Sequence, residues 1–470
     1  MRLATPMRIE KDTLGEVRVP QDALYGAQTQ RAVENYPISG LREHPLFIRS
    51  FILLKRSAAL ANRELGAMDQ QTADAIVAAC DRILRDFERF RPHFVVDVFQ
   101  AGAGTSFNMN CNEVIANLAN LSLGGKAGEY KPIHPNDHVN MAQSTNDVFP
   151  TAIRIATLML LDRLGPKLDQ LGDALDEKGE EFADVIKSGR THLADAVPVT
   201  LGQEFKAYAS AIRRATRLLR DAGEELRVLG IGGTAAGTGI NTPVGYRFAV
   251  VRHLSEATQL ELHPTEDLRE AMQSQLPVVA VSAAMRNLAL ELTRITNDLR
   301  LLASGPITGL AEIILPAVQP GSSIMPGKVN PSLLECMNQV LFHIIGADAA
   351  IAFASQAGQL ELNVMMPLMA FEITFSMEIL KNFLSVFIDK CVRGIAANRE
   401  RCEAYYISSP SLATALNPII GYTAAAELAK ESAKSGKRIP DMLREQKLLE
   451  EEKIAEIFTP EFLAGQADRL

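Results

Sequence analysis

Long apolar periodicity is the feature that most constrains how this chain can fold. Apolar residues recur at three- and four-residue steps, which is the spacing that keeps them on one face of a helix. The stretches with this pattern are 151–187, 265–303, 333–357 and 359–398. Helices longer than the average of about 11–12 residues pack most economically with near-parallel axes. The sequence therefore predicts a mainly α fold around a bundle of long helices.

The pattern changes along the chain in a way that predicts three domains. Residues 1–143 mix short, mostly helical elements with glycine-rich turns, residues 144–400 hold the long helices, and residues 401–470 form a small charged helical unit. Strand-like runs are few, and we expect strands at Glu16–Val19 and Leu193–Thr200.

Composition and charge exclude two classes of function. The chain has 48 Lys and Arg against 56 Asp and Glu, a net charge of −8, whereas a nucleic-acid binder normally needs a basic excess. The longest uncharged stretch, Ala404–Ala426, contains Pro410 and Pro418 and makes a poor membrane span. The first residues lack the apolar core of a secretory signal. We therefore expect a cytoplasmic protein with no nucleic-acid or membrane partner.

The cysteines and histidines predict no metal site. Five cysteines are scattered without CxxC spacing, which is typical of reduced thiols in a cytosolic protein. The eight histidines form no HExxH motif. We expect neither a metal nor a cofactor.

Four polar, glycine-rich islands interrupt the helical pattern. Small hydroxyl and amide side chains at this density are costly in a core unless each has a partner. A capping or turn role would explain any one island, but four together in one helical protein indicate a functional site. The islands are Gly102–Asn112 (GAGTSFNMNCN), His134–Pro150 (HPNDHVNMAQSTNDVFP), Ser188–Glu204 (SGRTHLADAVPVTLGQE) and Pro320–Pro331 (PGSSIMPGKVNP).

Two segments superficially resemble nucleotide-binding motifs. Gly321–Lys328 has five residues between its glycines and is followed by Val329, whereas a phosphate-binding loop needs four residues and then Ser or Thr. Gly230–Ala235 (GIGGTA) fits GxGxxA, but the stretch after it contains Pro243 and has the composition of a loop rather than of the required helix. A nicotinamide dehydrogenase is therefore the weakest functional hypothesis.

The four islands resemble the signature segments of the aspartase/fumarase superfamily, and GSSIMPGKVNP at Gly321–Pro331 is the most specific of them. The likeness runs from RIEKDTLGEVRVPQDALYGAQTQRA near the start to ALNPIIGYTAAAELAKESAKSGKRI near the end. It implies three mainly helical domains whose central bundle forms the core of a homotetramer. It also implies active sites that are each shared among three subunits. Some relatives are structural proteins without turnover, but the chemistry-bearing residues of the motifs are intact here.

Two branches of this superfamily must be distinguished. Fumarases typically carry GSGTQ and SSND where this chain has GAGTS (102–106) and STND (144–147). The later segment GQLELNVMMP (358–367) is similar to the aspartase pattern. Met366 and Ala194 depart from the usual Glu and Gln of that pattern. The resemblance implies an aspartate ammonia-lyase, a carbon–nitrogen lyase that reversibly eliminates ammonia from L-aspartate to give fumarate. A class II fumarate hydratase, which interconverts L-malate with fumarate and water, is the alternative.

The resemblance also implies roles for individual residues. Removal of a weakly acidic Cβ proton leaves an aci-carboxylate intermediate, which fixed hydrogen-bond donors must stabilise. Ser322 is the expected general base, and His192 and Lys328 are also expected catalytic residues. The Glu335 carboxylate would orient His192 by a hydrogen bond to its imidazole, or else it is a surface residue. The expected substrate-binding residues are Thr105, Ser144, Thr145 and Ser323 at the β-carboxylate, Thr191, Lys328 and Asn330 at the α-carboxylate, and Asn146 and His192 at the amino group.

Overall fold

The computed structural model describes residues 6–464 and divides into two compact units. Each unit is assembled from separate stretches of sequence. Unit 1 holds the chain up to Leu164, Leu218–Asn287 and His343–Ile379, and unit 2 holds Gly165–Arg217, Leu288–Phe342 and the chain from Leu380 onward. The division into domains 1–143, 144–400 and 401–470 stays a prediction.

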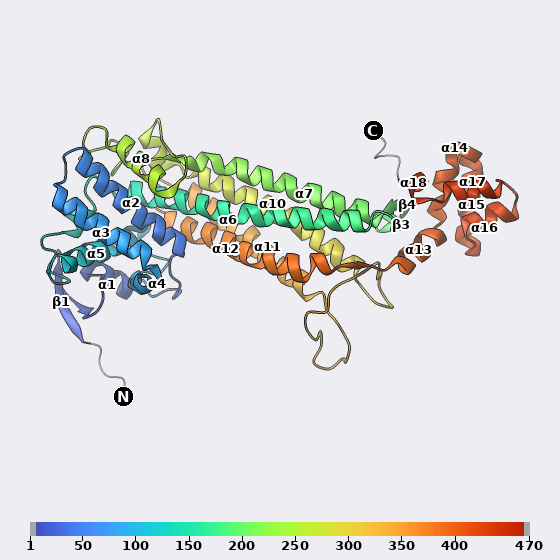
Figure 1. Cartoon of the computed structure of the whole chain (residues 1–470), viewed down its shortest axis with the longest axis horizontal. Helices are drawn as coiled ribbons and strands as arrows, with labels where there is room; N and C mark the ends of the chain where they lie inside the picture. Colours follow the sequence, from blue (N-terminus) through green and yellow to red (C-terminus); the bar gives the residue numbers. More distant parts are fainter. Residues whose placement is uncertain (1–5, 465–470) are drawn as a thin grey trace. The chain divides into compact units, whose positions relative to one another are not determined.

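Five long helices carry the mainly α fold that the periodicity predicts (Figure 1). They are α6 (Thr145–Glu181), α7 (Leu201–Gly223), α10 (Leu276–Leu302), α11 (Ser332–Gln356) and α12 (Met366–Lys390). Each of them contributes residues to both units. The predicted 265–303 stretch is interrupted before α10, which has Pro277 as its second residue, where a missing N–H is tolerated.

Polar contacts join α10 to α11 within each unit. In unit 1, Ser282 Oγ donates to Asp348 Oδ1 at 2.7 Å, and in unit 2, Thr296 Oγ1 donates to Asn338 Oδ1 at 2.5 Å. By length and composition alone, these two helices could cross a membrane. Only 39% of the most apolar window of α10 and 33% of that of α11 are buried. Much of their apolar surface is therefore left uncovered by this chain.

Unit 1 also contains shorter helices, two of which are joined to α6 by a cluster of phenylalanines. Phe47 and Phe51 of α2 contact Phe107 of α5 and Phe149 of α6, with ring centroids between 5.0 and 5.7 Å apart in the pairs Phe47–Phe51, Phe47–Phe107, Phe47–Phe149, Phe51–Phe107 and Phe51–Phe149. The helices are α1 (Ala27–Asn35), α2 (Pro45–Glu64), α3 (Gln70–Arg85), α4 (Phe87–Phe90), α5 (Thr105–Ser122), α8 (Tyr246–Thr258) and α9 (Leu268–Gln273).

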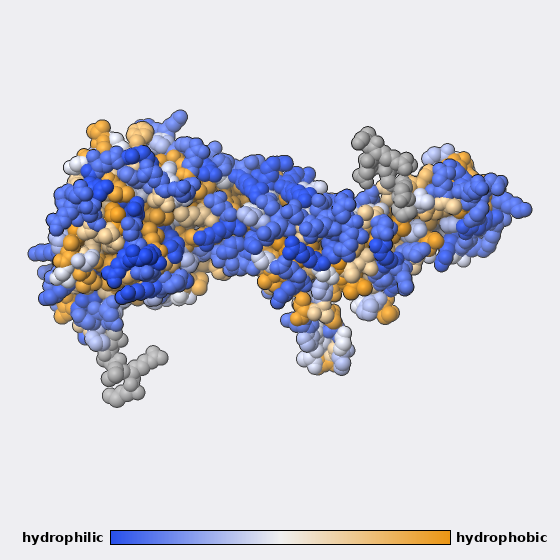
Figure 2. Space-filling view, viewed as in Figure 1, coloured by the Kyte–Doolittle hydropathy of each residue, from blue (hydrophilic) through white to orange (hydrophobic). Residues whose placement is uncertain are grey.

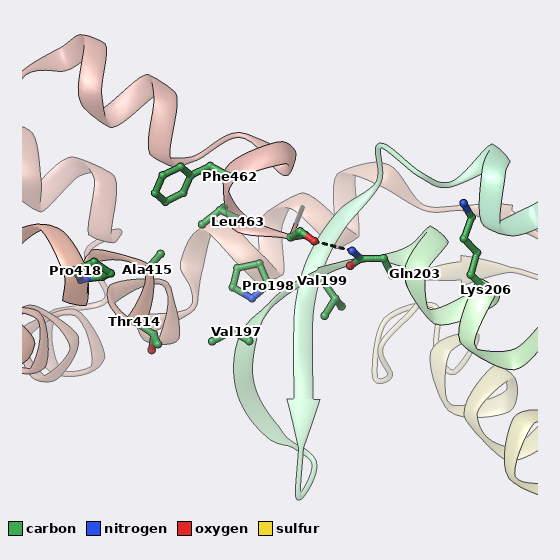
Figure 3. Close-up of a pocket in the computed structure, with 11 residues that line it drawn as sticks. Val197, Pro198, Val199, Gln203, Lys206, Thr414, Ala415, Pro418, Phe462 and Leu463 are labelled. Carbon is green, nitrogen blue, oxygen red and sulfur yellow. Dashed lines mark hydrogen bonds between the residues drawn. The ribbon is translucent and has the colours of Figure 1, made fainter. Parts of the chain in front are cut away.

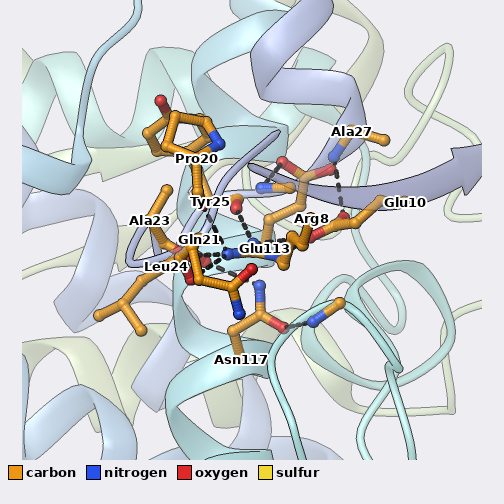
Figure 4. Close-up of polar contacts among 12 residues, drawn as sticks. Arg8, Glu10, Pro20, Gln21, Ala23, Leu24, Tyr25, Ala27, Glu113 and Asn117 are labelled. Carbon is orange, nitrogen blue, oxygen red and sulfur yellow. Dashed lines mark hydrogen bonds and ion pairs between the residues drawn. The ribbon is translucent and has the colours of Figure 1, made fainter. Parts of the chain in front are cut away.

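An N-terminal hairpin is fixed to unit 1 by buried charges (Figure 4). It pairs β1 (Met7–Asp12) with β2 (Gly15–Pro20), which contains the strand expected at Glu16–Val19. The Arg8 guanidinium donates to the backbone oxygens of Ala23 and Tyr25 at 2.7 Å each and pairs with Glu10 at 2.6 Å. Glu113 of α5 accepts N–H groups at the start of α1, where no side-chain N-cap is present, so a distant carboxylate caps this helix.

Unit 2 contains a hairpin and a set of small helices with their own apolar core. The hairpin pairs β3 (Ile186–Thr191) with β4 (Ala194–Thr200), which agrees with the strand expected at Leu193–Thr200. The core includes Leu416, Ile439 and Leu443, all at most 1% exposed. The small helices are α13 (Arg399–Ser408), α14 (Asn417–Ile420), α15 (Tyr422–Ser435), α16 (Ile439–Glu445), α17 (Glu451–Ile457) and α18 (Pro460–Leu463).

Short elements connect the larger ones. In unit 1, β5 (Val228–Leu229) pairs in parallel with β6 (His263–Pro264), and in unit 2, β7 (Ile313–Ile314) pairs antiparallel with β8 (Ala396–Ala397). The short 3₁₀ and π helices are Arg91–His93, Gly102–Gly104, Pro135–Val139, Glu224–Arg227, Val392–Gly394 and Pro410–Leu416.

Candidate active site

The residues expected at the site fall into both units. Within unit 1 they are Thr105, Ser144, Thr145 and Asn146. Within unit 2 they are Thr191, His192, Ser322, Ser323, Lys328, Asn330 and Glu335.

Ser144, Thr145 and Asn146 form the N-terminal turn of α6. Ser144 Oγ accepts the Asn146 N–H at 3.2 Å, and the Ser144 N–H donates to Asp147 Oδ1 at 2.9 Å, which is the reciprocal pattern of a capping box. The first turn of a helix carries partial positive charge from its aligned N–H groups. This turn is therefore suited to hold a carboxylate.

Thr105 is the exposed first residue of α5 and follows a glycine that no larger residue could replace without strain. Gly104 has φ +85°, and a Cβ there would lie 2.0 Å from the Phe149 ring. One turn further along α5, Asn108 Nδ2 donates to Thr145 Oγ1 at 3.0 Å. This bond joins the first turns of α5 and α6, so two helix N-termini that carry expected substrate-binding residues lie together.

A fully buried lysine supports this pair of helix ends. Lys55 Nζ donates to Asn108 Oδ1 at 2.7 Å and to Asn140 Oδ1 at 3.0 Å. Asn140 Oδ1 also accepts from Asn112 Nδ2 at 3.1 Å. Burial lowers the pKa of Lys55 to about 7. Lys55 is not among the residues expected at the site, although a Lys-Arg pair inside the otherwise apolar run FILLKRSAAL is a visible signal.

Asp147 is a second buried charge that holds the start of α6. Its carboxylate accepts the N–H groups of Ser144, Gly232 (3.0 Å) and Thr234 (2.9 Å). Burial raises the pKa of Asp147 to about 6, against the effect of these donors. The carboxylate therefore ties the predicted Ser144–Asn146 turn to the glycine-rich segment 230–235.

The segment 230–235 is a loop that buttresses the site. Asn146 Nδ2 donates to the Ala235 carbonyl oxygen at 2.8 Å. The preceding strand β5 has two residues, and the next helix, α8, begins only at Tyr246. The dinucleotide-binding interpretation, which needs a helix directly after the glycines, is thereby excluded.

In unit 2, Thr191 and His192 lie at the exposed tip of the β3–β4 hairpin. Thr191 pairs with Ala194, so His192 and Leu193 form a two-residue loop. Both have positive φ, +56° and +58°, as a type I′ turn requires. Such turns normally contain Asn or Gly, so this backbone conformation is strained and depends on the surrounding structure.

Ser322 lies in an exposed loop between β7 and α11 that is closed at its base. The Gly321 N–H donates to the Lys328 carbonyl oxygen at 2.9 Å, and Asn330 Nδ2 donates to the Gly321 carbonyl oxygen at 2.6 Å. Ser322 Oγ accepts the N–H groups of Ile324 (3.2 Å) and Met325 (3.0 Å). Two such donors stabilise negative charge on this oxygen.

Lys328 and Asn330 line a cavity of about 470 Å³ in unit 2, together with residues of the loop before β7 and Asn398. Glu335, in the first turn of α11, lies 3.9 Å from Arg300. Among the described residues, no hydrogen bond joins the hairpin tip at Thr191 and His192 to Ser322, Ser323, Lys328 or Glu335. The pairing of Glu335 with His192 stays a prediction.

A larger cavity of about 690 Å³ lies between β4, the start of α7 and the C-terminal helices (Figure 3). Gln203 Nε2 donates to the Ala464 carbonyl oxygen at 2.6 Å at its edge. Within residues 6–464, no expected site residue lines this cavity. Its size alone does not make it the site, so the residues expected from the sequence remain the candidate site.

His134, His138 and the cysteines lie in structural surroundings. His134 and His138 have the four-residue spacing of helical metal ligands, but the Nδ1 atom of each accepts backbone N–H groups. Within residues 6–464, no group of three or more His, Cys, Asp or Glu side chains could hold a metal ion. All five cysteines are free, and only Cys336 is not fully buried.

Comparison with known proteins gives a consistent family. A family model described as "Lyase" matches residues 15–346, and one described as "Fumarase C C-terminus" matches residues 412–465. An aspartate ammonia-lyase of Pseudomonas aeruginosa is 49% identical over 97% of this chain and 96% of its own length; one of a Bacillus species is 47% identical over 97% of both chains.

Solved structures agree with these sequences. A protein of Brucella melitensis titled "fumarate lyase:delta crystallin" superposes with a TM-score of 0.93 at 47% identity, covering 96% of this chain and 98% of that one. A class II fumarase from Schistosoma mansoni has the same TM-score at 36% identity, covering 98% and 100%. With its fold, its polar islands and its relatives in agreement over nearly the whole length, the chain belongs to the aspartase/fumarase superfamily of lyases.

Proposed function

We propose that this chain is an aspartate ammonia-lyase that interconverts L-aspartate with fumarate and ammonia. The observation that carries this proposal is the 47–49% identity, over nearly full length, to proteins of that name, against 36% to the class II fumarase. The GAGTS and STND segments support the same branch.

The β-carboxylate binds at the paired N-termini of α5 and α6. Thr105, Ser144 and Thr145 offer hydroxyl groups there, and the first-turn N–H groups add partial positive charge. Ser323 adds a hydroxyl from the loop. When the Cβ proton leaves, the electron pair is delocalised into this carboxylate as the aci-carboxylate. Donors fixed in advance stabilise that charge without reorganising, which is why they accelerate the step.

Ser322 removes the Cβ proton. Its Oγ already accepts two N–H groups, and Lys328 lies in the same loop, so the deprotonated oxygen is stabilised electrostatically. Lys328, Asn330 and Thr191 hold the α-carboxylate, and Asn146 and His192 face the amino group. Collapse of the intermediate forms the double bond, breaks the Cα–N bond and releases ammonia.

The protein acts as a homotetramer with each site shared among three subunits. The uncovered apolar surface of the long helices supports this assembly: Phe342 and Phe353 of α11 are 57% and 68% exposed, and Leu290 of α10 is 50% exposed. Hydrophobic residues also reach the surface on the face seen in Figure 2. We place the enzyme in the cytoplasm.

The test is fumarate formation, followed by its ultraviolet absorbance, from L-aspartate and from L-malate in separate reactions. An ammonium group offers three donors, whereas a hydroxyl offers one donor and two acceptors. We expect kcat/KM for L-aspartate to exceed that for L-malate by at least about 10²-fold, which is roughly 2.7 kcal/mol of transition-state binding. Faster turnover of L-malate would overturn the proposal in favour of a fumarate hydratase.

A further inference from the structure

A buried ion cluster lies beneath the β3–β4 hairpin and consists of Lys187, Arg190, Glu204 and Glu312. Lys187 Nζ lies 2.9 Å from Glu204 and 2.8 Å from Glu312, and Arg190 donates to both Glu312 oxygens at 3.0 and 2.8 Å. The Lys187 and Glu312 side chains are 1% and 0% exposed. Two positive and two negative charges balance, as buried charges must.

The register of the hairpin changes next to this cluster. Ser188 pairs with Pro198 and Arg190 with Asp195, so Gly189 lies opposite two residues of β4, and the extra residue of the β-bulge is on β4. A Cβ at Gly189 would lie 2.6 Å from the Val197 carbonyl oxygen, so the bulge requires glycine at the position opposite it. Lys187 and Arg190 lie on either side of this position, and both side chains reach Glu312.

Glu312 connects the hairpin to the framework of unit 2 through its backbone as well. Its N–H donates to the Leu302 carbonyl oxygen at the end of α10 (2.9 Å), and its carbonyl oxygen accepts the Asn398 N–H (2.9 Å) next to β8. The backbone of Glu312 is thus fixed by hydrogen bonds on both sides, independently of the contact between its carboxylate and Arg190. A planar guanidinium bound through two parallel bonds fixes orientation as well as distance.

The cluster contacts the hairpin at two places, one near its base and one near its tip. Glu204 contacts Lys187 at the base of the hairpin, whereas Arg190 directly precedes Thr191 and the strained His192–Leu193 turn. Stacking of the Arg190 guanidinium over the Tyr405 ring, 5.6 Å from its centroid, further restrains the tip end. The Arg190–Glu312 pair is therefore the nearest fixed point to the expected substrate contacts on the hairpin.

We propose that Arg190 and Glu312 are positioning residues whose two-bond ion pair, next to the β-bulge opposite Gly189, orients Thr191 and His192 toward the substrate. This inference rests on the proposed function, because it assigns Thr191 to the α-carboxylate. Neither residue touches the substrate. Misplacing a binding group by about 1 Å costs on the order of 10²-fold in rate, so a looser pair at this point has a measurable effect.

The test compares Arg190→Lys with two control variants in the full-length protein. Lysine keeps the charge but loses the second parallel bond, so KM for L-aspartate and the inhibition constant of succinate should both rise at least about fivefold. Arg399→Lys is the matched control, because Arg399 also donates two bonds, to Asp184 at 2.9 and 3.0 Å, in the same unit but away from the hairpin tip. Glu204→Gln weakens the base of the cluster, so it should lower the thermal midpoint and leave both constants within about twofold.

The readouts separate positioning from a merely structural role. Partial unfolding lowers the apparent kcat with KM and succinate affinity unchanged, and that result would overturn the proposal, as would equal constants for Arg190→Lys and wild type. Hydrogen exchange of residues 186–200 should be faster in Arg190→Lys than in Arg399→Lys, and equal exchange would also overturn it. If the wild-type protein does not turn over L-aspartate, the proposed function fails, while the exchange experiment still decides whether Arg190 fixes the hairpin.

Discussion

Replacing Gly104 with alanine should damage both stability and activity, because this glycine satisfies two constraints at once. Its φ of +85° lies in the left-handed region, and the added Cβ would meet the Phe149 ring at 2.0 Å. Phe149 is fully buried, with its ring 5.0 Å from that of Phe47, so it has little room to move away. Thr105 follows Gly104 directly and would be displaced with it.

The two constraints contribute separate amounts. The left-handed conformation costs a non-glycine residue roughly 1–2 kcal/mol, and overpacking in a tight core costs roughly 1–3 kcal/mol more. We therefore expect Gly104→Ala to lower the free energy of unfolding by about 2–5 kcal/mol. It should also lower kcat/KM for L-aspartate at least about tenfold, because the Thr105 hydroxyl would leave its position.

Gly124→Ala is the matched control. Gly124 has φ +84°, almost the same as Gly104, but a Cβ there meets nothing within 4 Å. Urea unfolding should show a loss of only about 1–2 kcal/mol for this variant, and its activity should stay unchanged. The difference between the two variants isolates the collision with Phe149.

A double variant, Gly104→Ala with Phe149→Leu, tests the collision directly. Leucine removes the ring atoms nearest to the new Cβ, so the double variant should be less destabilised than the sum of the two single changes by at least about 1 kcal/mol. Equal stabilities for Gly104→Ala and Gly124→Ala, or additive effects in the double variant, would refute the steric argument.

Three further predictions concern the chemistry, the assembly and a buried acid. Ser322→Ala should keep succinate affinity but lose most turnover in steady-state assays, and near wild-type kcat would remove Ser322 from the role of base. Inactive Thr191→Ala and Lys328→Ala proteins, unfolded and refolded together, should regain activity if sites are shared between subunits, whereas hybrids as inactive as their parents would place each site in one chain. Burial raises the pKa of Glu43 from 4.5 to about 8, and the neighbouring Asp97 carboxylate adds to the shift. The protonated Glu43 side chain therefore stabilises the folded state fully below about pH 4.5, and this contribution is lost as the pH rises through about 8. The urea midpoint of Glu43→Gln should fall less between about pH 5 and 9 than that of the wild-type protein. Parallel pH curves for the two proteins would contradict this prediction.

Local patterns predicted the helices well because a helix is specified by residues three and four apart. The 333–357 periodicity corresponds to α11 at Ser332–Gln356 almost residue for residue. The 151–187 pattern also predicted α6, although the helix begins six residues earlier, at Thr145 after the Ser144 cap, and continues through Pro166. It ends at Glu181, so the last two residues of the predicted stretch belong to β3 instead.

The supports of the site could not be predicted because they join distant positions. Arg190 and Glu312 are 122 residues apart, and although Glu312 is the only charged residue of 301–327, nothing in that segment identifies Arg190 as its partner. The bulge opposite Gly189 depends on the register of two strands, which the sequence of β3 alone does not fix. The turn at His192 and Leu193 lacks the Asn-Gly signal that would reveal it.

The interleaved make-up of the units has a consequence during synthesis. Unit 1 needs His343–Ile379 to complete its core, so it cannot close until most of the 470 residues have left the ribosome. Until then, the apolar faces of α6 and α10 lack the helix halves that cover them, and such surfaces are prone to aggregate. The nascent chain should therefore remain prone to aggregation during most of its synthesis. Its yield of active enzyme should depend on chaperones and on temperature more than the stability of the finished protein would indicate.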